Sequence, residues 1–155
     1  MRALIVGGGR RGLRLAEELT GEGHAVRVVT RTADREPDIE AVGAEPWRGD
    51  PDRIGTLRYA LENATVLLWL LGTVDVPELH GSRLAMMLER SVDTTVRGVL
   101  YEGRAGESVV QAAHDRHGIP IAFLDEDAAD VEAWVAGARA GIDALLATGR
   151  RSAAG

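Results

Sequence analysis

Near its start this chain reads Ala3-Leu4-Ile5-Val6-Gly7-Gly8-Gly9-Arg10-Arg11-Gly12-Leu13. Four consecutive apolar residues lead into a glycine turn, and apolar residues recur at helical spacing after the turn. Gly7, Gly9 and Gly12 match the G-x-G-x-x-G fingerprint of a strand–turn–helix unit that binds a dinucleotide. In that unit Gly7 makes the tight turn, Gly9 lets the backbone approach a pyrophosphate, and Gly12 lets helix and strand pack closely. The pyrophosphate then lies at the helix N-terminus, where free N–H groups favour negative charge.

Beyond this unit, short apolar runs alternate with segments of helical periodicity. We expect strands at residues 2–7, 25–30, 45–48, 65–71, 97–101 and 119–124. We expect helices at residues 10–20, 38–42, 52–61, about 80–91, 107–117 and 127–148, and a short tail at 149–155. This alternation predicts one α/β domain over residues 1–148, a three-layer Rossmann fold. Its doubly wound parallel sheet has the strand order 3-2-1-4-5-6. The ligand cleft is expected at the switch point of this order, between residues 7–12 and 71–73.

Composition narrows the range of functions. The net charge of −6 argues against general affinity for nucleic acids. The chain has no cysteine and no lysine, which excludes thiolate chemistry, Schiff bases and zinc sites with cysteine ligands. His114 and His117 lie one helical turn apart without a third ligand, so no metal site is expected. The longest apolar run, at residues 66–71, is too short to span a bilayer, and a strand begins where a signal peptide would lie. A cytoplasmic protein without membrane partners is the simplest interpretation.

Arg31 follows the second predicted strand, about where the fingerprint expects an acidic residue that binds the adenosine ribose. A guanidinium there suits the extra 2′-phosphate of NADP, which it can bind through two hydrogen bonds. Thr30 and Thr32 offer further hydrogen bonds, and Arg10, Arg11 and Arg35 offer further positive charge. The sequence therefore favours NADP(H) over NAD(H). The alternative is that Arg31 is an ordinary solvated arginine.

Four segments occur in the order typical of one protein family. They are Val-Gly-Gly-Gly-Arg-Arg-Gly at 6–12, Val-Arg-Val-Val-Thr-Arg at 26–31, Gly-Ala-Glu to Gly-Asp-Pro at 43–51, and Leu-Leu-Gly at 70–72. Together they resemble the N-terminal half of atypical or extended short-chain dehydrogenase/reductase proteins, the NAD(P)-binding group with epimerase-like and NmrA-like members. The resemblance covers residues 1–73 well, and the rest only as a strand–helix pattern.

The resemblance also implies roles for individual residues. It places Gly7, Gly9, Arg10, Arg11 and Gly12 along the pyrophosphate. Asp50 would accept a hydrogen bond from the adenine amino group, although a turn residue before Pro51 is the alternative. Leu71 and Gly72 would flank the ribose on the nicotinamide side.

The chain departs from this family in its catalytic residues. Members usually use a Tyr-x-x-x-Lys pair, and this chain has no lysine. His80 and Tyr101 lie near the ends of the fourth and fifth predicted strands and are the remaining catalytic candidates. The missing pair favours a nucleotide-binding sensor or regulatory module. A small atypical NADP-dependent oxidoreductase or isomerase is the first alternative, and a Rossmann domain with an empty site is the second.

The long final helix carries Trp134, a large side chain that one face of a sheet does not obviously cover. Because soluble oligomers are mostly symmetric and dimers are the commonest, we expect a homodimer.

Overall fold

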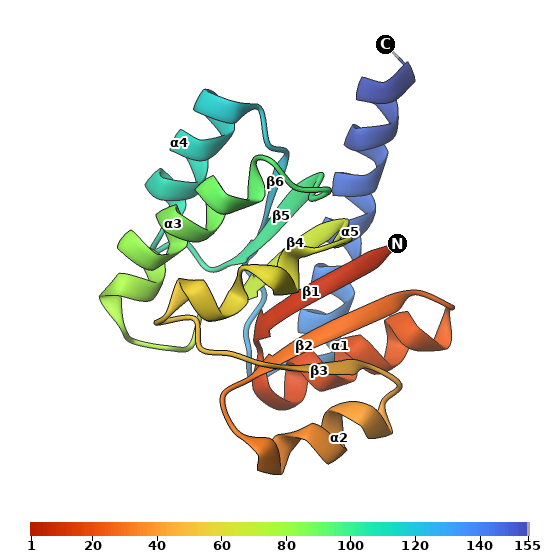
Figure 1. Cartoon of the computed structure of the whole chain (residues 1–155). Coiled ribbons are helices and arrows are strands. Elements are labelled where there is room, and N and C mark those ends of the chain that lie inside the picture. The colour runs from red at the N-terminus through yellow and green to blue at the C-terminus, as the bar shows by residue number, and fades with distance from the viewer. Residues whose placement is uncertain (155) are drawn as a thin grey trace.

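The computed structural model describes residues 1–154, and the side chains of residues 1–148. Six parallel strands form one sheet with helices on both faces (Figure 1). The strands are β1 (Arg2–Gly7), β2 (Ala25–Thr30), β3 (Glu45–Arg48), β4 (Val66–Leu70), β5 (Gly98–Glu102) and β6 (Ile121–Leu124). Their order in the sheet is β3-β2-β1-β4-β5-β6, which confirms the predicted Rossmann topology.

The helices follow the strands in the predicted alternation. The α-helices are α1 (Gly9–Gly21), α2 (Glu36–Ala41), α3 (Ser82–Ser91), α4 (Glu107–His117) and α5 (Val131–Ala154). Short 3₁₀ helices fill the connections: η1 (Ala33–Arg35), η2 (Ile54–Leu57), η3 (Tyr59–Leu61) and η4 (Pro77–His80). In Figure 1, α3 and α4 lie on one side of the sheet, and α1 and α5 lie on the other.

Strand β1 shows how the sheet is buried on both faces. Ala3 and Ile5 belong to the core cluster that includes apolar residues of α1, α2 and α5. Leu4 and Val6 alternate with them and join the opposite cluster, which includes residues of η2, α3 and α4. All four are fully buried, because side chains alternate between the two faces of a strand that helices cover on both sides.

The prediction of an α-helix at residues 52–61 is wrong, because the structure has the two 3₁₀ helices η2 and η3 there. The hydroxyl of Thr56 accepts from the backbone N–H of Asp50 at 2.8 Å and donates to the carbonyl of Arg53 at 2.7 Å. Such side-chain-to-backbone bonds offer the backbone an alternative to α-helical bonds. Gly55, in the middle of the segment, lowers its helix propensity further.

The C-terminal helix differs from expectation in two ways. It continues from Val131 to Ala154, through most of the segment that we expected to form a tail, and only Gly155 lies outside the described residues. No proline follows Thr148, and the one glycine between Thr148 and the helix end at Ala154, Gly149, costs only about 1 kcal/mol. Trp134 is fully buried within the chain, so it offers no surface to a second copy. The homodimer stays a prediction, and Trp134, the residue on which it was based, does not support it.

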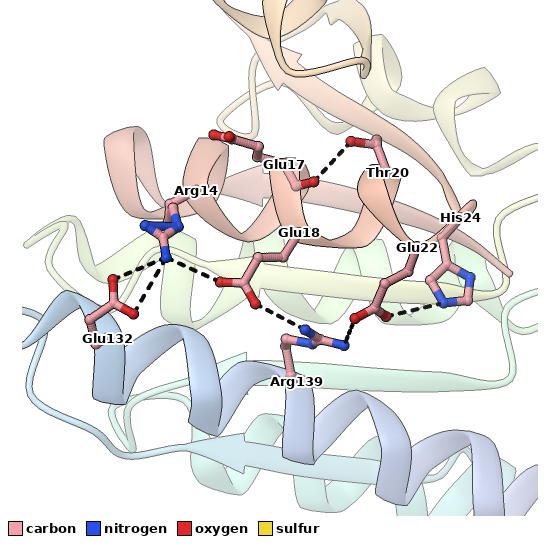
Figure 2. A network of polar contacts seen from close by, with 8 residues as sticks. All are labelled: Arg14, Glu17, Glu18, Thr20, Glu22, His24, Glu132 and Arg139. Carbon is pink, nitrogen blue, oxygen red and sulfur yellow. Dashed lines mark hydrogen bonds and ion pairs between the residues drawn. The ribbon is translucent and has the colours of Figure 1, made fainter.

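Ion pairs hold α5 against α1, the helix that follows the glycine turn (Figure 2). Arg139 on α5 pairs with Glu18 at 2.9 Å and with Glu22, both on α1. Arg14 on α1 pairs in turn with Glu132 on α5 at 3.1 Å. These contacts help to fix the direction of α1, and with it the direction of the N–H groups at its first turn.

Candidate functional site

The glycine turn between β1 and α1 has a backbone that other residues adopt only with strain. Gly7, Gly8 and Gly9 have φ angles of +88°, +85° and +52°, in the left-handed region that favours glycine. A Cβ on Gly12 would come within 2.9 Å of the carbonyl oxygen of Gly7, so the absence of a side chain at Gly12 lets helix and strand approach closely. A Cβ on Gly9 would meet no atom within 4 Å. The turn is therefore tightly packed beneath Gly7 and Gly12 and open at Gly9.

A cavity of about 740 Å³ lies over this turn, at the carboxyl ends of β1, β2 and β4. It is walled by the glycine turn, by the segment after β2, by the turn after β3, and by the segment after β4. The lining residues are Gly7, Gly8, Gly9, Arg11, Leu13, Val28, Val29, Thr30, Arg31, Thr32, Arg35, Ile39, Asp50, Pro51, Asp52, Leu70, Leu71, Thr73, Val74, Val76 and Leu79. The position matches the switch point between β1 and β4, where doubly wound sheets bind ligands.

One end of the cavity is polar and carries positive charge. Arg31 and Arg35 line it and are exposed, and neither forms an ion pair with a described residue. The hydroxyl of Thr30 is already engaged, because it donates to the carbonyl of Thr32 and accepts from the N–H of Thr32. Asp34, the nearby acidic residue, does not line the cavity, and a hydrogen bond from the side chain of Thr32 lowers its pKa. At this end the two guanidinium groups are therefore positive charges without an ion-pair partner among the described residues.

Asp50 lies at the same end, where it lines the cavity and also forms a turn. It lines the cavity, as the proposed contact with adenine requires. One of its carboxylate oxygens also accepts from the backbone N–H of Asp52 at 2.9 Å, the bond of a turn-forming aspartate. Its other oxygen has no hydrogen bond to a described residue.

The other end of the cavity, after β4, is mainly aliphatic. Leu71, Val74, Val76 and Leu79 line it, together with Thr73. Gly72 does not, which departs from its expected place beside a ribose. Its N–H donates at 2.8 Å to the carboxylate of Glu102, and a Cβ on Gly72 would come within 2.6 Å of that side chain. Gly72 is thus packed against β5 and not against the ligand space.

Arg11 lines the middle of the cavity, and Arg10 does not. Arg10 is exposed on the first turn of α1. The guanidinium of Arg11 lies over the ring of Trp134, 5.4 Å from its centroid, and one terminal nitrogen is 3.5 Å from the hydroxyl of Thr73. No described carboxylate pairs with Arg11, and its Nε is buried without a hydrogen-bond partner among the described residues. Gly12 also lies behind the lining, as its packing role requires.

The two catalytic candidates, His80 and Tyr101, contact each other, but neither lines the cavity. His80 Nε2 lies 2.9 Å from the carbonyl of Val74, which accepts only, so Nε2 carries the proton. His80 Nδ1 then accepts from the hydroxyl of Tyr101 at 2.6 Å, and that hydroxyl accepts from the N–H of Gly106 at 2.7 Å. Burial raises the pKa of Tyr101. The pair therefore holds the segment of Val74 and Leu79 against β5.

The sequence analysis missed the aliphatic wall after β4, formed by Val74, Val76 and Leu79, and missed Ile39 on α2. The available signal was the position of residues 73–79, which form a loop at the ligand-binding edge of the sheet. Among the described residues, no three histidine, aspartate or glutamate side chains gather closely enough to hold a metal ion. None of the helices in the described part of the chain has the length and apolar character that crossing a bilayer requires.

Known proteins are similar to this chain in structure. No protein-family model matches it, and no curated protein matches its sequence. The triphenylmethane reductase of Citrobacter sp., complexed with NADP(H), matches with a TM-score of 0.65 and 18% identity, over 81% of this chain and 49% of that one. The UDP-glucuronic acid 4-epimerase of Bacillus cereus, in complex with NAD, matches with a TM-score of 0.64 and 14% identity, over 79% and 55%. An NADPH-dependent quinone oxidoreductase of Escherichia coli matches with a TM-score of 0.58 and 15% identity, over 81% and 47%.

These similarities confirm the resemblance to reductase- and epimerase-like Rossmann proteins at the level of the fold. The chain spans about half the length of the structures that it matches.

Proposed function

We propose that this chain binds a nicotinamide dinucleotide in the cavity over the glycine turn. The observation that carries the proposal is the contrast within the turn: Gly7 and Gly12 are closely packed, and Gly9 opens toward free space. An open backbone at the N-terminus of α1 is what a pyrophosphate needs, because unpaired N–H groups and the helix dipole attract it. The volume of about 740 Å³ is in the range of small-molecule sites.

The charges of the cavity suit a ligand with several phosphates. Arg11, Arg31 and Arg35 line it without a carboxylate partner among the described residues, and the carboxylates of Asp50 and Asp52 line it as well, the second of them paired with Arg83. Arg11 lies at the middle, beside the glycine turn, where the pyrophosphate is proposed. Arg31 and Arg35 lie at the end proposed for the adenosine.

We further propose that NADP(H) binds better than NAD(H). A guanidinium that binds the 2′-phosphate makes charge-assisted hydrogen bonds worth about 1.5–3 kcal/mol each. One such bond corresponds to about tenfold or somewhat more in the dissociation constant. Arg31 and Arg35 are exposed, so NAD(H) leaves them in water at little cost. The preference is therefore moderate, and it shrinks as salt rises.

The proposed role of the bound dinucleotide is regulatory: the chain binds it as a sensor or partner-binding module, without turnover. The supporting observation is that the polar atoms of His80 and Tyr101 are engaged with each other and with backbone groups, and that neither residue lines the cavity. The alternative is a small NADP-dependent oxidoreductase or isomerase. The reductases and the epimerase with the same fold favour it, as does the aliphatic end of the cavity, which suits a nicotinamide ring.

Titration calorimetry with NADPH and NADH tests the binding. The parent should bind both nucleotides, and NADPH more tightly. Arg31→Ala should weaken the binding of NADPH but not that of NADH, so most of the difference in affinity between the two should disappear. Arg53→Ala is the matched control, since Arg53 is exposed near the same end but does not line the cavity. If neither nucleotide binds, the site is empty and the proposal fails. Consumption of NADPH with a panel of carbonyl compounds and quinones would favour the oxidoreductase alternative over the regulatory role.

A further inference from the structure

Arg11 is held by an unusual set of contacts for a side chain that lines a cavity. Its guanidinium lies over the face of Trp134, and its only hydrogen bond to a described residue is a long one, 3.5 Å to the hydroxyl of Thr73. Its Nε is buried without a partner among the described residues. An unpaired buried donor is costly, so the contact with the indole face is what holds the guanidinium in this orientation.

The indole of Trp134 is held in turn by a hydrogen bond to a buried carboxylate. Glu102, at the end of β5, is only 4% exposed. One of its carboxylate oxygens accepts from Trp134 Nε1 at 2.8 Å, and the other accepts from the N–H of Gly72 at 2.8 Å. Trp134 has no exposed surface, so the ring cannot turn without breaking this bond. A carboxylate, an indole and a guanidinium thus lie in sequence from β5 through α5 to α1.

We propose that Trp134 and Glu102 are positioning residues, which hold the guanidinium of Arg11 at the cavity wall for the pyrophosphate of a bound dinucleotide. The inference rests on the proposed function, because that function supplies the anion. Arginine is a long side chain that loses conformational freedom when it binds a ligand. A guanidinium already held on an aromatic face loses less, so binding is tighter than for a freely moving arginine. The indole N–H bond to the Glu102 carboxylate polarises the ring and strengthens its attraction for the cation.

The test is a double-mutant cycle read with two ligands, inorganic pyrophosphate and NADPH. Arg11→Met removes the charge, Trp134→Leu removes the aromatic face, and Trp134→Phe keeps a smaller aromatic ring. If Trp134 acts through Arg11, Trp134→Leu alone should weaken pyrophosphate binding about threefold to tenfold relative to the parent. In a protein that already carries Arg11→Met, adding Trp134→Leu should cause no further loss of binding. Trp134→Phe should lie between the parent and Trp134→Leu. Arg14→Met removes the same charge one turn along α1, on a side chain outside the cavity, and should leave binding unchanged.

Intrinsic fluorescence gives a second readout for variants that fold poorly. Pyrophosphate should change the tryptophan fluorescence of the parent, because Arg11 lies on the ring of Trp134. The change should disappear in Trp134→Phe and in Arg11→Met, although Trp47 and Trp69 remain in both.

The inference and the proposed function can fail separately. The positioning role would be overturned, even if NADPH binds normally, by either of two results. One is that Trp134→Leu lowers the affinity for pyrophosphate equally with and without Arg11, and the other is that the fluorescence change persists in Arg11→Met. Pyrophosphate binding with the expected coupling, but no binding of NADPH or NADH, would support the positioning role and overturn the dinucleotide function. A parent that binds neither pyrophosphate nor a dinucleotide overturns both.

Discussion

Gly7 and Leu70 lie opposite each other at the ends of β1 and β4, and a Cβ on Gly7 would come within 2.4 Å of the carbonyl oxygen of Leu70. The closeness of these two backbones places the glycine turn directly beside the segment after β4. The two walls of the cavity therefore meet at Gly7 and Leu70, both of which line it. Two residues further on, Gly9 has free space where Gly7 has a neighbouring strand.

This contrast predicts that Gly7→Ala and Gly9→Ala fail in different ways. Gly7→Ala combines a positive φ with a backbone clash and should lower the free energy of unfolding by about 2–5 kcal/mol. Gly9→Ala has only the positive φ and should cost about 1–2 kcal/mol, while it weakens NADPH binding by obstructing the open backbone. Urea unfolding and calorimetric titration measure the two effects. Gly21→Ala, at the open far end of α1, is the control, and a Gly9→Ala protein with parental affinity would contradict the assignment.

The choice of cofactor should follow the charge at Arg31. Arg31→Asp places a carboxylate beside the 2′-phosphate of NADP and should reverse the preference in favour of NADH, by repulsion. The preference of the parent should shrink between about 0.05 M and about 0.5 M NaCl, because salt screens exposed charges. Competitive binding of NADPH and NADH measures both. An Arg31→Asp variant that keeps the parental preference would show that Arg31 is only a solvated surface residue.

Tyr101 should make the fold sensitive to alkaline pH. Burial raises the pKa of its phenol in the folded chain, so the folded state keeps a proton that the unfolded state releases at about pH 10. Its contribution to the free energy of unfolding is complete below that pH and is lost as the pH rises through the raised pKa. Because the chain has no lysine, few other groups titrate in this range.

Urea unfolding at about pH 8 and about pH 10.5 checks this dependence. At the lower pH, Tyr101→Phe should lower the free energy of unfolding by about 1–3 kcal/mol, since His80 and the N–H of Gly106 lose their partner. Between the lower and the higher pH, the free energy of unfolding should fall less in Tyr101→Phe than in the parent. Tyr59→Phe, at a side chain that is 59% exposed, should behave like the parent. Identical pH dependence in the parent and Tyr101→Phe would count against the role of Tyr101.

Arg139 should stabilise the chain through its pairs with Glu18 and Glu22. Arg139→Met leaves two carboxylates one helical turn apart without a cation between them, which is unfavourable. Because these groups are partly exposed, we expect the free energy of unfolding to fall by about 1 kcal/mol at low salt, and by less at about 1 M NaCl. Urea unfolding measures the loss. Arg97→Met, at an exposed arginine without an ion pair among the described residues, is the control, and equal losses in both variants would contradict the prediction.

The sequence predicted the sheet because its signals are local and strong. The run of apolar residues before Gly7, and the glycine spacing after it, fixed a strand, a turn and a helix, and chain alternation with right-handed crossovers then gave the strand order. The same local signal located the cavity at the glycine turn. Arg31 and Asp50 both line this cavity, because each lies within two residues of the end of a strand at the same edge of the sheet, and their roles toward a ligand stay predictions.

The contacts that the sequence did not predict join residues far apart in the chain. Nothing near Gly72 indicates that its N–H binds Glu102, and nothing near Arg11 indicates that it lies over Trp134. His80 and Tyr101 were identified only as polar residues near two strand ends, because periodicity carries no information on which polar group each side chain binds. The helix expected at residues 52–61 failed for a similar reason, since the bonds of the Thr56 hydroxyl depend on a turn that apolar spacing does not describe.

Hydrogen exchange, measured by mass spectrometry with and without NADPH, tests the central claim most directly. The first N–H groups of an α-helix have no partner within the helix and exchange quickly, and a pyrophosphate bound at the start of α1 would protect them. We predict that NADPH slows exchange in residues 7–12 and 30–35 and leaves α3 and α4, on the opposite side of the sheet from α1, unchanged (Figure 1). Unchanged exchange at residues 7–12 in the presence of saturating NADPH would contradict the claim that this cavity binds the dinucleotide.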